Sequence, residues 1–208
     1  MKKIAILLTC FNRKEITKKC LESLFLFDIE FDVYLVDDGS TDGTSQEISK
    51  LYPAVTIIKG DGDLFWNRGM ALAWKKASIN DYDYYIWLND DVILYENACD
   101  EIFECTKLKN NKAIISGVIE NHARDRIIYG GFDANRKLVV PNGVMKEINR
   151  LNGNFVLVPK YVYLSLGGLD TIFHHDLGDV DYGLRAQKKG IKVWSTREAI
   201  ASGETNRI

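Results

Sequence analysis

Ile86-Trp87-Leu88-Asn89-Asp90-Asp91-Val92 is an apolar strand that ends abruptly in an amide and two adjacent carboxylates. Adjacent like charges cost free energy unless water or a cation neutralises them. A hard divalent cation, Mg²⁺ or Mn²⁺, accepts such oxygen ligands and leaves coordination positions for phosphate oxygens. The stretch therefore indicates either a metal site at the end of a buried strand or a solvated turn.

Strand-like runs before this stretch alternate with helical patterns. The predicted strands are residues 4–8, 33–36, 55–58 and 84–88, and the predicted helices begin near Asn12, near Thr44 and near Trp66, with a fourth after the last strand. Strands separated by crossover helices pair in parallel. The first part of the chain, residues 1–110, therefore predicts a βαβ layout.

The pattern changes after residue 110, where short strands are separated by Gly130-Gly131 and Pro141-Asn142-Gly143, which are typical of hairpin turns. The predicted elements here are strands over 113–118, 127–129, 138–140, 154–158 and 191–194, and helices from Lys160 and over 179–189. We expect one α/β domain over 1–208, with a mixed, mostly parallel central sheet flanked by helices.

Composition excludes several classes of protein. The 208 residues, 46% of them hydrophobic, suffice for a single core. A formal charge of −2 spread along the chain gives no basic stripe for a nucleic acid. The four cysteines show no CxxC spacing, and no apolar run approaches the roughly 20 residues that cross a bilayer. We expect a cytoplasmic protein, with peripheral attachment to the inner face of the plasma membrane left open.

Two further clusters lie where ligands bind in open α/β sheets, beyond the carboxyl ends of strands. Asp38 follows the second strand and could accept hydrogen bonds from a nucleobase or a ribose; a polar turn with a helix cap is the alternative. Arg68 follows a glycine-rich loop and could pair with a diphosphate; a loop packed down by Phe65 and Trp66 is the alternative.

Asp179 and Asp181 fall in the first turn of a predicted helix, where the helix dipole stabilises acids by about 0.3–1 kcal/mol. Stabilisation of the helix N-terminus can therefore explain both aspartates without a catalytic role. The functional alternative is a general base, and it requires desolvation or positioning because an ordinary Asp has a pKa near 3.9.

In this order, the segments resemble family 2 glycosyltransferases with the GT-A fold, from residue 4 to about 194. The resemblance is carried by Thr9-Cys10-Phe11-Asn12-Arg13, by Val36-Asp37-Asp38-Gly39-Ser40-Thr41-Asp42, by Asn89-Asp90-Asp91 in place of a DxD motif, and by residues 152–158, 167–170 and 178–185 on the acceptor side. The stretches 65–70 and 87–91 resemble members that build bacterial surface polysaccharides, some of them rhamnosyltransferases.

The resemblance implies an inverting transfer of a sugar from a UDP- or dTDP-sugar to a hydroxyl of a glycan or lipid-linked glycan. Asp179 would be the catalytic base and Asp91 the ligand of Mg²⁺ or Mn²⁺. Nucleotide contacts would come from Thr9, Phe11, Arg13, Asp38, Arg68, Asn89 and Asp90, and acceptor or sugar contacts from Asn154, Asp181 and Trp194. Phe11 would stack on the base, and Asn89 would approach the ribose.

Three departures from the family pattern stand out. Asn89 replaces the first acid of the DxD motif, and Gly178 replaces a glutamate beside Asp179. Many relatives also carry a histidine after the last strand, often as a metal ligand, where this chain reads Ala-Ser-Gly-Glu at 201–204. The metal shell is therefore incomplete or the chain shortened.

Three rival functions remain. A sugar-phosphate nucleotidyltransferase would need a glycine-rich phosphate loop after the first strand, and residues 9–13 contain no glycine. A phospho-acceptor receiver domain would leave the segment around Asp179 unexplained. A glycosyltransferase-like domain without activity is the third, suggested by Gly178 and the missing histidine.

Overall fold

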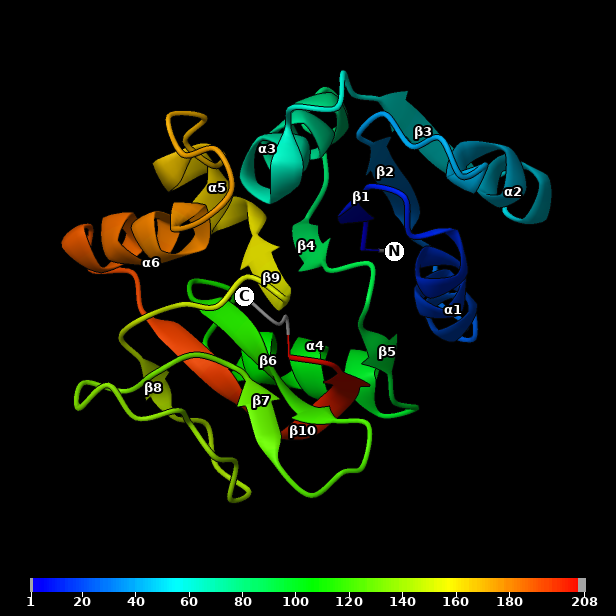
Figure 1. The fold of residues 1–208 in the computed structure, drawn as a ribbon. Coiled ribbons are helices and arrows are strands. Elements are labelled where there is room, and N and C mark those ends of the chain that lie inside the picture. The colour runs from blue at the N-terminus through cyan, green and yellow to red at the C-terminus, as the bar shows by residue number, and fades with distance from the viewer. Residues whose placement is uncertain (1, 206–208) are drawn as a thin grey trace.

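The computed structural model describes residues 2–205, which form one mixed sheet with helices on both faces (Figure 1). The expected domain bounds at residues 1 and 208 lie outside this range. The strands run in the spatial order β3-β2-β1-β4-β9-β6-β10-β5, with β7 beside β6 and β8 beside β10. Their bounds are β1 Ile4–Cys10, β2 Asp32–Asp37, β3 Val55–Lys59, β4 Tyr84–Leu88, β5 Ile93–Leu94, β6 Ile114–Asn121, β7 Ile127–Tyr129, β8 Glu147–Ile148, β9 Phe155–Pro159 and β10 Val193–Gly203.

The first half of the sheet is parallel, as the alternation of strands and helices predicts. β3, β2, β1 and β4 pair in parallel, and β9 then joins β4 antiparallel. β6 pairs with β10 in parallel and with β7 as an antiparallel hairpin. The mixed α/β architecture is confirmed. Because β9 runs opposite to β4, the residues before β9 meet the residues after β4 at one edge.

Two apolar layers hold the helices against the sheet. Successive residues of a strand face opposite sides, so Ile6 and Leu8 of β1 join one buried cluster and Leu7 joins the other. The first cluster packs under α1 (Lys14–Leu24), α2 (Thr44–Leu51) and α4 (Ala98–Leu108); the second packs under α3 (Phe65–Ala77), α5 (Lys160–Leu166) and α6 (Gly178–Lys188). Trp74 and Trp87 are fully buried in the second cluster.

Several boundaries differ from the sequence prediction. No strand forms over 138–140, where Leu138 makes only an isolated bridge to Phe132. The first helix begins at Lys14 because Asn12 has a left-handed φ of 50° and accepts a hydrogen bond from the Thr41 N–H instead of capping the helix. The last strand continues to Gly203.

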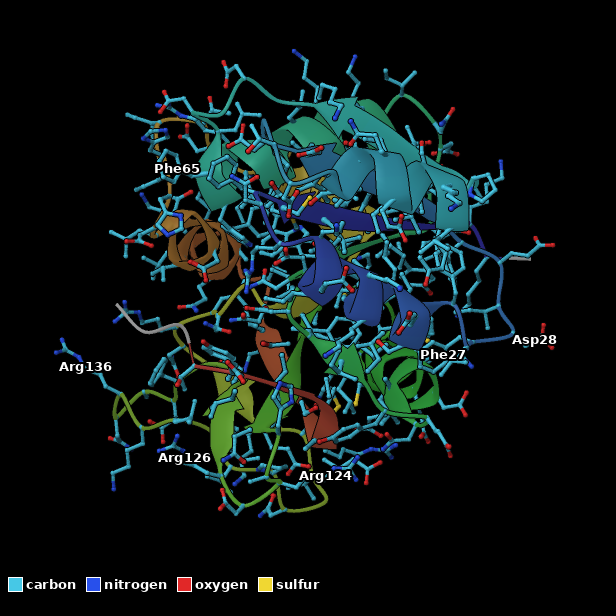
Figure 2. The ribbon with its side chains drawn as sticks, turned by 45° about the vertical axis from the view of Figure 1, so that its right-hand side comes forward. Phe27, Asp28, Phe65, Arg124, Arg126 and Arg136 are labelled. Carbon is cyan, nitrogen blue, oxygen red and sulfur yellow. The ribbon has the colours of Figure 1, made fainter. Side chains whose placement is uncertain are left out.

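Arg124, Arg126 and Arg136 lie around the β6–β7 hairpin and the loop after it, below Phe65 in the view of Figure 2. Among residues 2–205, none of the helices has the length and apolar character that crossing a bilayer requires.

Candidate active site

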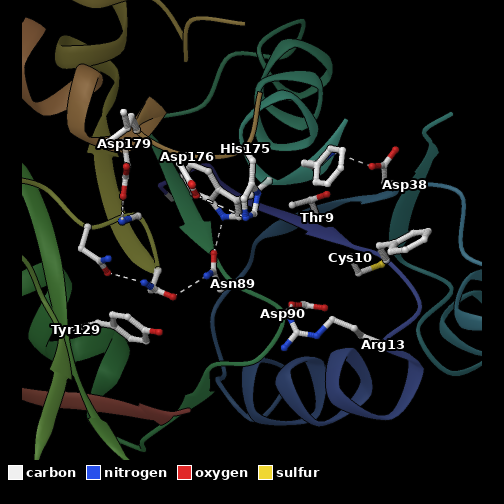
Figure 3. A pocket seen from close by; sticks show the side chains of 17 residues that line it. Thr9, Cys10, Arg13, Asp38, Asn89, Asp90, Tyr129, His175, Asp176 and Asp179 are labelled. Atoms are coloured by element: carbon white, nitrogen blue, oxygen red, sulfur yellow. Dashed lines mark hydrogen bonds and ion pairs between the residues drawn. The ribbon is translucent and has the colours of Figure 1, made fainter. Parts of the chain in front are cut away.

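A pocket of about 770 Å³ opens where β1 and β4 end and where β9 begins (Figure 3). This is the sheet edge at which α/β proteins bind ligands. Its walls combine the two halves of the chain, because the segment before α6 lies opposite the ends of β1 and β4. The lining residues are Thr9, Cys10, Phe11, Arg13, Asp38, Phe65, Trp66, Asn89, Asp90, Tyr129, Asn152, Gly153, Asn154, His175, Asp176, Leu177 and Asp179.

Arg13 neutralises the acid pair at the end of β4. Its guanidinium donates to Asp90 Oδ1 at 2.9 Å and to Asp91 Oδ2 at 3.0 Å, and the Thr17 hydroxyl donates to the second oxygen of Asp90 at 3.1 Å. Burial raises the pKa of Asp90 to about 7, although the charge of Arg13 opposes the rise. Asp90 therefore ties α1 to β4, and Arg13 replaces water as the partner of both acids.

Asp91 is the one predicted metal ligand. Its Oδ2 is held by Arg13, while its Oδ1 accepts no hydrogen bond from residues 2–205. In the described part of the chain no three Asp, Glu, His or Cys side chains gather in a way that could hold a metal ion. Asp91 lies outside the pocket lining and would offer a cation one carboxylate oxygen, so the rest of the shell would have to come from phosphate and water, a common arrangement for Mg²⁺.

Asp38 forms part of the pocket wall, and its carboxylate organises the neighbouring loop. Its Oδ1 accepts the Gly62 N–H at 2.9 Å, and its Oδ2 accepts the Leu64 and Phe65 N–H groups at 3.0 and 2.9 Å. The expected contact with a nucleobase could use only the remaining lone pairs. Asp38 thereby holds Phe65 at the pocket, where Phe65 and Phe11 are both about half exposed, at 49% and 52%.

The amide of Asn89 is the centre of a hydrogen-bonded row across the pocket floor. Its Oδ1 accepts the indole N–H of Trp66 at 2.7 Å, and its Nδ2 donates to Asn154 Oδ1 at 2.6 Å. The Nδ2 of Asn154 donates in turn to Asn152 Oδ1 at 2.5 Å. The predicted site residues Asn89 and Asn154 are therefore brought together.

Asp179 lies in the first turn of α6 and faces the pocket from the side formed by the second half of the chain (Figure 3). Burial raises the pKa of its carboxyl, against hydrogen bonds from the Val180 N–H at 2.7 Å and the Gly153 N–H at 2.8 Å. A raised pKa makes the carboxylate a stronger base than an ordinary Asp. Asp179 therefore has the desolvation that a general base requires.

The side chain of Asn67 explains why position 178 is a glycine. The sequence did not predict this contact. A Cβ at Gly178 would lie 1.7 Å from Asn67 Oδ1, so no side chain fits there. Asn67 is fully buried and its Nδ2 donates to the Asp170 and Phe173 carbonyls at 2.8 and 2.6 Å. Asn67 therefore fixes the segment that leads into α6. The contact spans 111 positions of sequence between α3 and α6, and no local pattern signals it.

Four predicted site residues do not line the pocket: Arg68, Asp91, Asp181 and Trp194. Arg68 donates through Nε to the Thr171 carbonyl, and Asp181 pairs with Arg185 at 2.7 Å on the same helix. Trp194 lies on β10 with the Lys109 ammonium 3.5 Å from its ring centroid. Each of these side chains has its partner outside the pocket, so their predicted contacts with substrate stay predictions. Conversely, nine lining residues were not predicted as site residues: Cys10, Phe65, Trp66, Tyr129, Asn152, Gly153, His175, Asp176 and Leu177.

Comparison with known proteins agrees with this architecture. The model of glycosyl transferase family 2 matches residues 5–152. The chain is 24% identical over 123 residues to the poly(ribitol-phosphate) beta-N-acetylglucosaminyltransferase TarP of Staphylococcus aureus (strain N315), a match that covers 55% of this chain and 36% of the relative.

Solved structures of S. aureus TarS share the fold. Residues 1–349 of TarS in complex with UDP-GlcNAc superimpose with a TM-score of 0.73 at 13% identity, covering 100% of this chain and 60% of that chain. A longer TarS chain gives a TM-score of 0.72 at 14% identity, covering 99% of this chain and 37% of that chain. This chain thus spans little more than a third of the curated relative and at most 60% of these structures. The fold is the GT-A fold, and the chain belongs to glycosyl transferase family 2.

Proposed function

We propose that the chain transfers a sugar from a nucleoside-diphosphate sugar to an acceptor hydroxyl with inversion at the anomeric carbon. The observation that carries the proposal is one pocket that joins the strand ends of the nucleotide side to Asp179, a carboxyl whose pKa burial raises. Asp179 lies on the side of the pocket formed by the second half of the chain. A donor and an acceptor can therefore meet beside a base.

In the proposed reaction Asp179 takes the proton of the acceptor hydroxyl. The acceptor oxygen then forms a bond to the anomeric carbon as the bond from that carbon to the diphosphate oxygen breaks, and the nucleoside diphosphate leaves with the electron pair. The single displacement inverts the anomeric centre and needs no covalent enzyme intermediate. General base catalysis of this kind contributes typically about 10²–10⁴-fold to a rate.

The donor side would bind the nucleotide of a UDP- or dTDP-sugar. The exposed ring of Phe11 offers a surface for stacking a base, and Thr9, Arg13 and Asn89 also line the pocket. When bound, Mg²⁺ or Mn²⁺ would neutralise the charge that develops on the leaving diphosphate. Asp91 would hold the ion, and Arg13 would keep Asp90 and Asp91 in place.

The acceptor would be a glycan or lipid-linked glycan of bacterial surface polysaccharide synthesis. The supporting observation is the likeness to TarP, whose name gives poly(ribitol-phosphate) as its acceptor, and to TarS, which has been solved with UDP-GlcNAc. Peripheral attachment to the membrane that carries a lipid-linked acceptor is part of the same proposal.

A donor screen followed by product analysis tests the function. Thermal shifts across UDP- and dTDP-sugars identify the donor, and release of the nucleoside diphosphate with a surface-polymer acceptor measures transfer. NMR of the product gives the anomeric configuration. Inverted product supports the proposal, and retained configuration contradicts it. Donor binding without transfer to any acceptor would favour the alternative of an inactive glycosyltransferase-like domain.

A further inference from the structure

Three asparagine side chains form a continuous row from Trp66 to the far wall of the pocket. The dashed lines in Figure 3 that meet at Asn89 belong to this row, which links Asn89, Asn154 and Asn152 through contacts of 2.5–2.7 Å. All four side chains line the pocket. Asn154 is 6% exposed, so water competes little for its amide.

The direction of every hydrogen bond in this row is fixed by the indole. A tryptophan N–H can only donate, so the atom of Asn89 that faces Trp66 must be its oxygen. The Asn89 amide then has only its NH₂ group to offer Asn154, whose oxygen accepts. By the same reasoning Asn154 donates to the oxygen of Asn152. The usual ambiguity of asparagine orientation is thereby removed.

The end of the row is a hydrogen-bond donor. Asn152 uses its oxygen inward and keeps its NH₂ group, which makes no hydrogen bond with residues 2–205, while the residue is only half-buried in the pocket wall. An amide that can only donate favours a ligand oxygen that can only accept. A ligand hydroxyl is selected less strongly by such an amide, because a hydroxyl can rotate to face either a donor or an acceptor.

We propose that Asn152 determines substrate specificity by donating to an acceptor-only oxygen. That oxygen is either the acetamido carbonyl of the transferred sugar or a phosphate oxygen of the acceptor polymer. The inference rests on the proposed function, and it adds a residue that the family resemblance did not assign. The same role accounts for an asparagine at position 89. An aspartate there would present an acceptor oxygen to Asn154, so the amides of Asn154 and Asn152 would both have to flip. The oxygen of Asn152, instead of its NH₂ group, would then face the ligand.

Asn152→Asp is the decisive variant. One carboxylate oxygen still accepts from Asn154, whereas the outward group changes from a donor to an acceptor. The matched control is Asn149→Asp, which adds the same charge at an exposed position three residues away and outside the pocket. Asn89→Asp should change selectivity in the same direction as Asn152→Asp, because it reverses the row from its other end.

Two comparisons distinguish the source of the oxygen. The donor comparison measures Kd and kcat/KM for UDP-GlcNAc against UDP-glucose, and the acceptor comparison measures kcat/KM for a phosphate-containing polymer against a neutral glycan. We expect Asn152→Asp to lower the preference in one comparison at least about tenfold, since a site built around a donor penalises the mismatch strongly. The control variant should keep the wild-type preference.

Unchanged preferences in both comparisons for Asn152→Asp would overturn the inference. A protein that binds nucleotide sugars but transfers none would contradict the proposed function, while the ratio of Kd values for the two donors would still test Asn152. The two failures are therefore distinguishable.

Discussion

Replacing Gly178 by alanine tests the packing that holds the segment leading to Asp179. In the middle of a helix, alanine is more stable than glycine by about 0.5–1 kcal/mol because it loses less conformational entropy on folding. Here the new Cβ would lie 1.7 Å from Asn67 Oδ1, far inside van der Waals contact. Overpacking of this kind costs about 1–3 kcal/mol.

Relief of that overlap requires Asn67 to move, and movement weakens its hydrogen bonds to the Asp170 and Phe173 carbonyls. Each such bond contributes about 1 kcal/mol net. We therefore expect Gly178→Ala to lower the free energy of unfolding by about 2–3 kcal/mol. In the Asn67→Ala background the three atoms nearest to the new Cβ are absent, and the same substitution should be neutral or stabilise by up to about 1 kcal/mol.

Urea unfolding of the wild type, both single variants and the double variant measures the coupling between the two positions. Gly168→Ala serves as the matched control, because its Cβ would meet nothing closer than a Trp74 ring atom at 3.9 Å. Additive effects, or a Gly178→Ala variant as stable as the wild type, would refute the account of Gly178.

Three further predictions concern the charged groups of the pocket. Burial raises the folded-state pKa of Asp90 from 3.8 to about 7, so this group contributes stability that is present below pH 4 and lost as the pH rises through 7. The loss amounts to at most about 4 kcal/mol. Asp90→Asn should remove this pH dependence, which unfolding free energies measured from pH 4 to 8 would show. UDP or dTDP should raise the Tm only with Mn²⁺ or Mg²⁺, and Asp91→Ala should abolish the shift. The raised pKa of Asp179 should place the acid limb of the kcat pH profile above the range of an ordinary aspartate, because the base acts only when deprotonated.

Each of these has an outcome that contradicts it. For Asp90, the contrary result is a stability difference between variant and wild type that stays constant across pH. If the nucleotide raises the Tm as much in EDTA as it does with Mn²⁺ or Mg²⁺, the proposed metal at Asp91 is contradicted. A kcat that remains at its plateau down to the pH of a free aspartate would show that Asp179 is not the group whose ionisation limits turnover.

Local patterns in the sequence predicted most of the first half of the fold. The apolar runs that became β1 to β4, and the helical stripe that buries Cys20 and Leu21, each repeat with the period of their element. The run at 138–140 did not become a strand, because its pairing reduces to one bridge at Leu138. Whether a short apolar run pairs depends on a distant partner that its own residues do not reveal.

Most of the predicted site residues line one pocket. Asp38, Asn89 and Asp179 could be found because each directly follows or begins a predicted element at the ligand-binding edge. Their partners could not be found. Arg13 over the acid pair and Asn67 against Gly178 are contacts between elements far apart in the chain, so only the packed structure shows that these side chains occupy the space beside the predicted ones.

The central claim is that Asp179 is the base of a sugar transfer, and one comparison tests it most directly. Asp179→Asn and Asp181→Asn make the same change two residues apart, but Asp181 pairs with Arg185 outside the pocket. Donor binding by calorimetry and transfer rate should be measured for both. The account predicts that Asp179→Asn binds donor like the wild type and loses about 10²–10⁴-fold in kcat, while Asp181→Asn retains turnover. Near-wild-type turnover of Asp179→Asn would contradict it.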